Sequence, residues 1–493
     1  MIGLFYLTTI KQDDLFFLGS IIDQSTGEII ELEELINKYD YAFVDENINL
    51  VWADICQLLL QKGYHQEPYE KKADKLFSVS YKSGACINIT IKNGQKTLRI
   101  ANFSSKFNID YGEYEENKKL LDYANKKERQ SSSLGNDAFN EWIRSAFKVH
   151  GRILNINASK AVFRRDYPIL TDDETRILET AKANVSGFQH VKTGRYKNLY
   201  EYDICSSFPS QLINATPKGE TIIFDEISDI PRDYFYIVKF TALNVKLKPN
   251  CFDIFSARDT MTLTLTKHMF ELFNKNYEYS DIGQHFCFAY KTRTNIFNDF
   301  VFDNIITGKE HENDKQIAKY NKSITNSIIG YFGRNTESEQ SYYAYNPASR
   351  KFNILRQKIK REPIYQPIYL FVNGKAKFEF ISVLQDIVGI KHVIYANTDG
   401  FITDKEIDLK ALNFGRNSQL GYFKLKCKYT DIQINSINGY VGITDTGTTK
   451  QAISGIKLTG LITPDQYANA DYSYTIHELD EESGLIRETK LQS

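Results

Sequence analysis

Two aspartates that lie far apart in the chain are of a type that could hold divalent metal ions. A short strand at the start of the stretch 199–213 delivers Asp203, and Asp399 stands in a turn at 397–400 between apolar arms. Each could serve only local structure, since Asp-Gly is common in hairpin turns. Together, two carboxylates from two strand ends are the minimum protein contribution to a two-metal phosphoryl-transfer site. Asp203 and Asp399 are therefore candidate catalytic residues and candidate ligands of two Mg²⁺ ions, for which Mn²⁺ could substitute.

The residues after Asp203 favour a phosphate site beside the metal ions. Ser206 and Ser207 can cap a helix whose first turn contains Pro209, as helix starts commonly do. The free backbone N–H groups of a helix N-terminus face anions. A strand-end carboxylate beside them would bind a cation and a polyphosphate together.

Residues 314–334 are predicted to form an amphipathic helix with a basic face. The apolar face carries Ile317, Tyr320, Ile324 and Ile328. The opposite face carries Lys315, Lys319, Lys322 and Asn326. Gly330 and Gly333 would end the helix and permit close approach of another backbone or a flat ligand. The lysines could be a solvated face, or they could neutralise a triphosphate and its departing pyrophosphate.

The elements that must position these residues change in character along the chain. Residues 1–123 alternate strand-like runs with the apolar helical run 52–60, which indicates a mixed α/β domain. The polar stretch 126–133 is the best linker candidate. From about residue 196 onward, strand, turn, helix and hairpin segments follow one another.

The composition indicates a folded protein of roughly two or three subdomains. Hydrophobic residues make up 42% and charged residues 25% of the 493 residues, which excludes a largely disordered chain. No stretch is long and apolar enough to cross a bilayer, and no basic leader is evident. We therefore expect a cytoplasmic protein without a membrane partner. The six cysteines form no CxxC pair, which argues against a zinc cluster or a disulfide framework.

A local basic run stands out from the net charge of −1. Residues 347–361 contain no acid and include Arg356, Lys358 and Lys360. The run could be a solvated hairpin face, or it could line a groove for nucleic acid.

Three stretches, taken in order, resemble motifs A, B and C of the family B DNA polymerases. They are DICSSFPS at 203–210, KSITNSIIG at 322–330 and YANTDG at 395–400. Further stretches, at 186–188, 361–380 and 421–457, resemble the protein-primed branch of small linear-DNA phages. The resemblance implies an α+β right-hand polymerase with palm, fingers and thumb, preceded by an RNase H-like exonuclease-type α/β domain.

The resemblance also implies domain boundaries. An exonuclease-like domain is expected at 1–123, a linker and helical connection at 124–195, palm and fingers at 196–420, and a thumb at 421–493. Within the third part, the fingers are expected at about 290–334, and insertions at about 214–289 and 340–365.

Roles carry over from the family residue by residue. Asp203 and Asp399 would hold the metals, with the carbonyl of Ile204 as an added ligand. Phe208, with Ser207 beside it, would lie under the sugar of the dNTP and exclude ribonucleotides. Further contacts with the dNTP are implied for Lys322, Asn326, Lys315 and Lys319. Contacts with DNA are implied for Asn373, Lys377, Arg356, Lys358, Lys360 and Tyr440.

Several positions depart from the family pattern. Asn397 replaces an aspartate, which should weaken metal affinity, and Ile329 replaces a tyrosine beside the nascent base pair. In the N-terminal part, residues that cannot bind a metal stand where the exonuclease acids would lie, namely Phe5, Leu7, Val51 and Lys118. Asp45, Glu46 and Asp54 lie near the second of these segments without partners in the others. No divalent ion is expected there.

The sequence thus predicts a template-directed, protein-primed DNA polymerase without 3′–5′ proofreading. Its partners would be template and primer DNA, dNTPs and a terminal protein, in the cytoplasm of a bacterial host of a phage. One alternative is a polymerase-like nucleic-acid-binding protein that no longer catalyses. Another is a template-independent nucleotidyltransferase.

Overall fold

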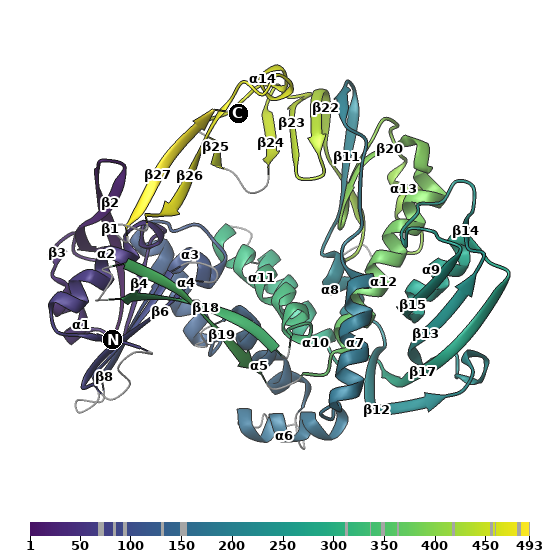
Figure 1. Ribbon diagram of the computed structural model, residues 1–493, viewed down its shortest axis with the longest axis horizontal. Helices are drawn as coiled ribbons and strands as arrows, with labels where there is room; N and C mark the ends of the chain where they lie inside the picture. The colour runs from purple at the N-terminus through teal and green to yellow at the C-terminus, as the bar shows by residue number, and fades with distance from the viewer. Residues whose placement is uncertain are drawn as a thin grey trace.

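Two large β-sheets, connected by helices, form the framework of the protein in the computed structural model (Figure 1). The structure describes residues 1–493 except 68–72, 82–84, 92–95, 130–132, 148–154, 311–313, 336, 347–350, 362–363, 417–419, 454–456, 459, 481–484 and 493. None of the described helices is long and apolar enough to span a membrane.

The first sheet belongs mainly to the N-terminal part of the chain. Its strands are β1 (Ile2–Gln12), β2 (Leu15–Asp23), β4 (Tyr41–Val44), β5 (His65–Gln66), β6 (Lys75–Tyr81), β7 (Ala85–Ile91) and β8 (Lys96–Asn102). The associated helices are α1 (Leu32–Lys38), α2 (Ile48–Gln61), α3 (Phe103–Phe107) and α4 (Tyr114–Lys126). Strands β1, β4 and β8 run parallel, and α2 packs its apolar face into the core beside them. The predicted α/β character of this region is confirmed.

The C-terminal strands complete this first sheet. They are β25 (Lys457–Leu458), β26 (Ser473–Leu479) and β27 (Ile486–Gln492). Strand β27 lies beside β2, with Leu15 opposite Arg487, and Lys11 Nζ is 2.7 Å from Glu488 Oε1. The chain therefore returns to its N-terminal domain, as the yellow strands at the left of Figure 1 show.

The second sheet carries the candidate aspartates. Its strand order is β24 (Thr449–Ile453), β23 (Gly439–Thr444), β22 (Phe423–Ser436), β11 (Leu199–Ile204), β21 (Gly400–Thr403), β20 (Val393–Asn397) and β9 (Gln189–Val191), and β10 (Gly194–Tyr196) also pairs with β22. Strand β11 is central, between β21 and β22. A strand with neighbours on both sides holds its side chains in fixed positions, which suits a site residue.

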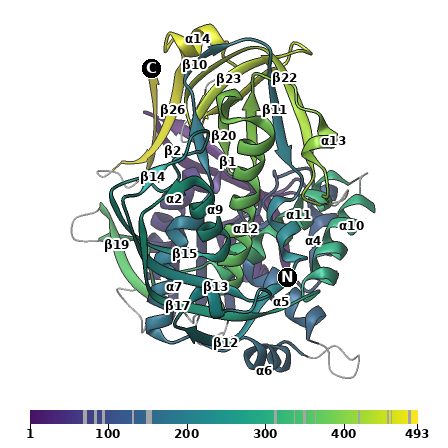
Figure 2. The same ribbon diagram turned by 90° about the vertical axis from the view of Figure 1, so that its right-hand side faces the viewer.

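Further helices and a smaller sheet make up the rest of the central part of the chain. They include α5 (Leu134–Ala146), α6 (Ile156–Asp166), α7 (Asp172–Val185), α8 (Ser207–Leu212), α10 (Asn298–Glu310), α11 (Lys315–Phe332) and α12 (Pro367–Val383). Helix α12 is apolar around most of its circumference and is buried, as such helices must be. Figure 2 turns α9 (Lys267–Asn276) toward the viewer, with the four-stranded sheet β12 (Thr216–Phe224), β17 (Asp281–Arg293), β13 (Phe235–Leu243) and β15 (Thr260–Thr266).

Much of the basic run lies on β19 (Lys351–Lys360), which forms a two-stranded hairpin with β18 (Glu337–Asn346). The prediction of a hairpin here is confirmed. Arg356 and Lys358 are exposed, whereas the side chain of Lys360 lies outside the described residues. The predicted boundaries of the domains, fingers and insertions stay predictions.

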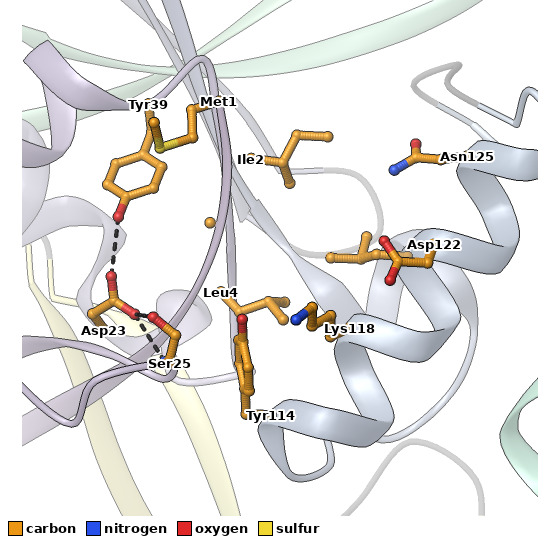
Figure 3. A pocket seen from close by; sticks show the side chains of 12 residues that line it. Met1, Ile2, Leu4, Asp23, Ser25, Tyr39, Tyr114, Lys118, Asp122 and Asn125 are labelled. Carbon is orange, nitrogen blue, oxygen red and sulfur yellow. Dashed lines mark hydrogen bonds between the residues drawn. The ribbon is translucent and has the colours of Figure 1, made fainter.

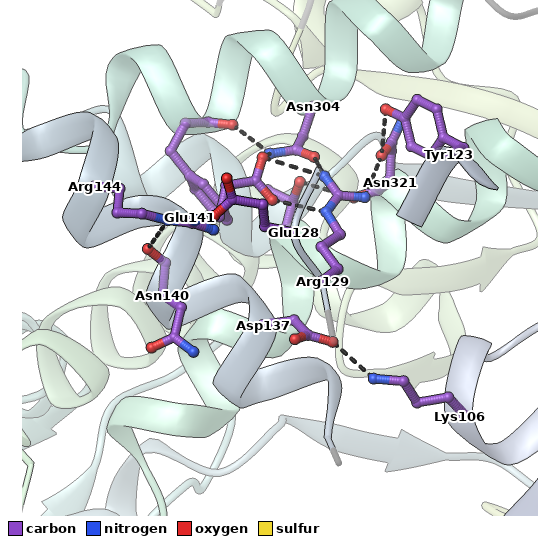
Figure 4. Close-up of polar contacts among 12 residues, drawn as sticks. Lys106, Tyr123, Glu128, Arg129, Asp137, Asn140, Glu141, Arg144, Asn304 and Asn321 are labelled. Carbon is purple, nitrogen blue, oxygen red and sulfur yellow. Dashed lines mark hydrogen bonds and ion pairs between the residues drawn. The ribbon is translucent and has the colours of Figure 1, made fainter. Parts of the chain in front are cut away.

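A buried polar cluster joins α10 and α11 to the helices before them (Figure 4). The side chain of Arg129 is fully buried, and its Nε lies 2.8 Å from Glu141 Oε2 on α5. Its Nη2 donates to Asn304 Oδ1 on α10 at 2.6 Å, and its Nη1 donates to Asn321 Oδ1 on α11 at 2.9 Å. The guanidinium also lies 5.1 Å from the ring of Tyr320. Arg129 falls in the stretch expected to be a polar linker, and it is instead an internal anchor of α11.

Candidate active site

The register of the second sheet brings Asp203 and Asp399 together. Asp203 of β11 pairs with Gly400 of β21, the residue directly after Asp399. The N–H of Ile204 donates to the carbonyl oxygen of Asp399, with 3.0 Å between nitrogen and oxygen. Two residues that are remote in sequence are therefore neighbours, held by backbone pairing rather than by flexible loops.

The turn that presents Asp399 is supported from the segment before β9. Thr398 adopts a left-handed φ of 60°, and its N–H donates to the Phe188 carbonyl at 2.8 Å. A Cβ at Gly187 would lie 2.6 Å from Thr398 Oγ1, so a side chain there would displace the turn. Asn397 is engaged locally, because its Oδ1 accepts from Thr398 Oγ1 and its Nδ2 donates to the Tyr395 hydroxyl.

Charged groups on three elements act on the carboxyl group of Asp399. Burial and then the neighbouring charge of Asp203 raise the pKa of Asp399 to about 6. The charges of Lys322 on α11 and Lys426 on β22 act in the opposite direction. Two carboxylates that repel each other in a partly buried site, with only oxygen ligands, fit a hard cation such as Mg²⁺. Among the described residues, no group of three or more His, Cys, Asp and Glu side chains forms a richer metal site.

Helix α8 differs in detail from the predicted cap. Ser206 occupies the N-cap position with a left-handed φ of 52°, but its side chain makes no capping hydrogen bond. Ser207 is the first helical residue and is buried, and Pro209 lies in the first turn as expected. Phe208 is half-buried at this end of the helix. Ser206 thus occupies the predicted N-cap position, whereas the capping hydrogen bond expected from its side chain is absent.

The two predicted faces of α11 are confirmed. Ile317, Tyr320, Ile324 and Ile328 are buried, and the exposed residues are Lys315, Lys319, Lys322 and Asn326. The expectation for the glycines is only partly met. A Cβ at Gly333 would lie 2.3 Å from the Tyr369 ring, so the close approach is that of a side chain of α12. A Cβ at Gly330 would have no atom within 4 Å apart from those of the adjacent helix backbone.

The candidate DNA contacts on α12 and β23 are less accessible than those on the hairpin. Asn373 is buried and donates to the Tyr369 carbonyl of its own helix. Lys377 Nζ donates to the Asn184 carbonyl at 3.1 Å, and burial lowers the pKa of this lysine to about 8. Tyr440 is buried beside Tyr395, with 5.5 Å between ring centroids. Contacts of all three with DNA remain predictions.

The N-terminal positions compared with exonuclease acids are hydrophobic core positions or exposed helix positions. Phe5, Leu7 and Val51 are at most 2% exposed within one apolar cluster. Lys118 is exposed on α4, with its Nζ 5.4 Å from the ring of Tyr114. Asp45 is buried and accepts hydrogen bonds from Asn47.

A cavity of about 290 Å³ opens between the start of β1 and α4 (Figure 3). Its lining contains the carboxylates of Asp23 and Asp122 together with the ammonium group of Lys118. Asp23 already accepts from the Tyr39 hydroxyl and from Ser25. This lining does not suit a divalent metal ion, because the ammonium group of Lys118 would repel it and the Asp23 carboxylate is already hydrogen-bonded.

Sequence patterns missed Glu201 and Lys426 beside the two aspartates. Lys426 Nζ lies 3.0 Å from Glu201 Oε1, and Glu201 precedes Asp203 by two residues on β11. The alternation of side chains along a strand could have indicated Glu201, because it places residues 201 and 203 on one face of β11.

Comparisons with known proteins agree with this arrangement. Residues 185–400 match the family model of DNA polymerase type B, organellar and viral. The DNA polymerases of Bacillus phages Nf and M2 are each 25% identical over 271 residues, which is 48% of this chain and 46% of each relative. The match therefore spans less than half the length of these curated relatives.

Solved structures extend the likeness to the whole chain. Phi29 DNA polymerase complexed with primer-template DNA aligns over 99% of both chains, with a TM-score of 0.77 at 15% identity. Its orthorhombic crystal form aligns over 100% of both chains, with a TM-score of 0.77 at 14% identity. The predicted fold class is confirmed: the chain has the mixed α+β fold of this polymerase over its full length, with both the exonuclease-type and the polymerase parts.

Proposed function

We propose that the protein is a template-directed DNA polymerase that uses Asp203 and Asp399 to hold two divalent ions. The observation that carries the proposal is the meeting of these two acids beside Lys322, since β11, the turn at 397–400 and α11 come from three remote parts of the chain. Support also comes from the fold and from the family match over residues 185–400.

The residues of the chain divide the work of phosphoryl transfer. Asp203 and Asp399 provide carboxylate oxygens, with the Ile204 carbonyl as a further candidate ligand. When bound, the ions would activate the attacking hydroxyl and stabilise charge on the triphosphate. The exposed lysines of α11 would neutralise the triphosphate and the departing pyrophosphate, with Asn326 near the nucleotide. The ring of Phe208 would lie under the sugar and exclude a 2′-hydroxyl by its bulk.

The finer proposal is that the attacking hydroxyl can belong to a terminal protein as well as to a DNA primer. It is supported by the sequence resemblance of residues 186–188, 361–380 and 421–457 to the protein-primed branch. Arg356, Lys358 and Lys360 on the hairpin, together with Asn373, Lys377 and Tyr440, would contact DNA. The absence of proofreading is likewise proposed, and it is supported by the apolar environment of Phe5, Leu7 and Val51.

Incorporation of labelled dNTP by the purified protein tests the proposal. With Mg²⁺ or Mn²⁺, label should enter DNA only when both a primer and a complementary template are present. Incorporation without a template would favour the template-independent nucleotidyltransferase. Binding of primer-template without any incorporation, with either metal, would favour the catalytically silent DNA-binding protein, which the substitution at Asn397 keeps as the second candidate.

A further inference from the structure

Strand β22 has an irregularity directly beside the two aspartates. Tyr202 of β11 pairs with Leu425, and Glu201 pairs with Cys427, so Lys426 is an extra residue without a partner in β11. Such β-bulges commonly re-aim a side chain next to an active site. Here the re-aimed side chain is a lysine, and its Nζ lies 3.0 Å from Glu201 Oε1.

Glu201 is a buried anchor with several partners. Its side chain is 8% exposed, whereas that of Lys426 is 44% exposed. Lys450 Nζ lies 2.8 Å from Glu201 Oε2, and the Tyr429 hydroxyl donates to the same oxygen at 2.5 Å. Because Tyr429 and Lys450 hold the carboxylate from one side, its Oε1 remains directed at Lys426. A buried carboxylate with charged partners is a strong constraint on the lysine that it binds.

Lys426 binds Glu201, and residues 201 and 203 of β11 share one face of the strand, so the lysine lies on the face that carries Asp203. Its charge acts on Asp399, and the charge of Asp203 acts on Lys426. A lysine has a long, flexible stem and can exchange one carboxylate partner for another. Without Glu201, the ammonium group would have the acid pair as its nearest remaining counter-charge, and it would compete there with divalent cations.

We propose that Glu201 is a positioning residue that holds Lys426 away from Asp203 and Asp399, and that Lys426 limits the affinity of this acid pair for divalent ions. The proposal rests on the proposed function, because it takes the two aspartates as metal ligands. It predicts opposite effects for the two partners. Neutralising Glu201 frees the lysine and weakens metal binding, whereas neutralising Lys426 removes the competing charge and strengthens metal binding.

Binding of Mn²⁺ to the full-length protein tests this, with the electron paramagnetic resonance signal of free Mn²⁺ as the readout. Binding that persists in Asp399→Ala is subtracted as binding elsewhere. Glu201→Gln should raise the Kd roughly 3- to 10-fold and Lys426→Gln should lower it by a similar factor, as expected for one charge at short range near a protein surface. The double variant should have the lowered Kd of Lys426→Gln, because Glu201 acts through the lysine and has no effect once the lysine is absent.

Lys428→Gln is the matched control. Lys428 lies on the same strand and pairs with Glu406 at 3.0 Å, and its removal should leave the Kd of Mn²⁺ unchanged. Equal Kd values for wild type and Lys426→Gln, or shifts of both single variants in one direction, would overturn the proposal. If Glu201→Gln does not fold, Lys426→Gln against Lys428→Gln decides alone. Failure of the proposed function would differ, since wild type would then bind no more Mn²⁺ than Asp399→Ala and would not extend a primer.

Discussion

At the scale of single residues, the candidate site brings two carboxylates together, and burial and repulsion disfavour the charged form of one of them. Asp399 is partly buried next to another carboxylate, and both effects favour its neutral form. Among the described residues, neither Asp203 nor Asp399 forms an ion pair with a basic side chain. Lys426, Lys428 and Lys450 pair with other acids instead. A bound divalent ion would relieve the repulsion between the two carboxylates, and this relief would contribute to the binding free energy of the metal.

Asp399→Ala should reduce primer extension with Mg²⁺ or Mn²⁺ by far more than the 10- to 100-fold that loss of a residue supporting a metal ligand typically causes. Without metal ions, Asp399→Ala should unfold at the same temperature as wild type or at a higher one. The substitution removes a partly buried carboxylate that the charge of Asp203 repels. Extension assays and thermal unfolding check the two parts. Extension at wild-type rate would remove Asp399 from the metal site.

Lys377→Met should stabilise the protein at neutral pH, and the gain should fade in alkali. Burial lowers the pKa of Lys377 to about 8 from an ordinary value of 10.5, so the folded state disfavours the ammonium form. The destabilisation is therefore full below pH 8 and is lost as the pH rises to 10.5. A gain on the order of 1–2 kcal/mol at pH 7 is expected after the lost hydrogen bond to Asn184 is offset.

Urea unfolding at pH 7, 9 and 10 measures this gain. Lys410→Met, at an exposed position on the short helix α13 (Leu409–Leu412), is the control and should show no trend with pH. A stability difference between Lys377→Met and wild type that stays constant from pH 7 to pH 10 would mean that the buried ammonium group is not its cause.

At the scale of elements, α11 shows what local sequence can and cannot predict. Its two faces follow from a period of 3.6 residues, so the exposed lysines were predictable from spacing alone. The partners of its buried face were not predictable, because Arg129 meets Asn304 and Asn321 only after distant segments have packed.

The pairing of β11 with β21 and β22 was not predictable either. Alternation indicates strands, but the bulge at Lys426 depends on the register between them. The motif order located Asp203 and Asp399, whereas Glu201 belongs to no motif.

Arg129→Met should loosen α11 and destabilise the protein by roughly 3–5 kcal/mol, the usual effect of breaking a buried ion pair from one side. Glu141, Asn304 and Asn321 would all lose their shared donor. Since α11 also carries the lysine row, the KM for dNTP should rise in whatever fraction stays folded. Denaturant unfolding and steady-state extension check these two effects.

Arg144→Met provides the comparison on the neighbouring helix. Arg144 pairs with Glu128, whose side chain is 71% exposed, and such surface pairs contribute about 0–1 kcal/mol. Its loss should therefore leave both stability and KM nearly unchanged. Similar destabilisation by the two substitutions would show that Arg129 is not a special anchor of α11.

At the scale of the whole molecule, the C-terminal strands of the chain pair with its N-terminal sheet. The second sheet leads through β24 to the C-terminal strands, and these join the first sheet at β2 (Figure 1). Ile486 of β27 is buried in the same apolar cluster as Phe5 and Val51. The N-terminal domain therefore contacts the C-terminal strands through shared core packing.

The last expected outcome follows from the burial of Phe5, Leu7 and Val51, which offer no metal ligand, in the apolar cluster: the pure protein should not shorten the 3′ end of a labelled primer with Mg²⁺ or Mn²⁺ in the absence of dNTP. Asp45, Glu46 and Asp54 are the acids near the segment that resembles the second exonuclease motif. Of these, Asp45 accepts from the Asn47 N–H and Asp54 accepts from the Leu18 N–H. Any shortening caused by reversal at the polymerase site should vanish in Asp399→Ala. Metal-dependent shortening that persists in Asp399→Ala but disappears in Asp45→Asn would instead place a working exonuclease in the N-terminal domain.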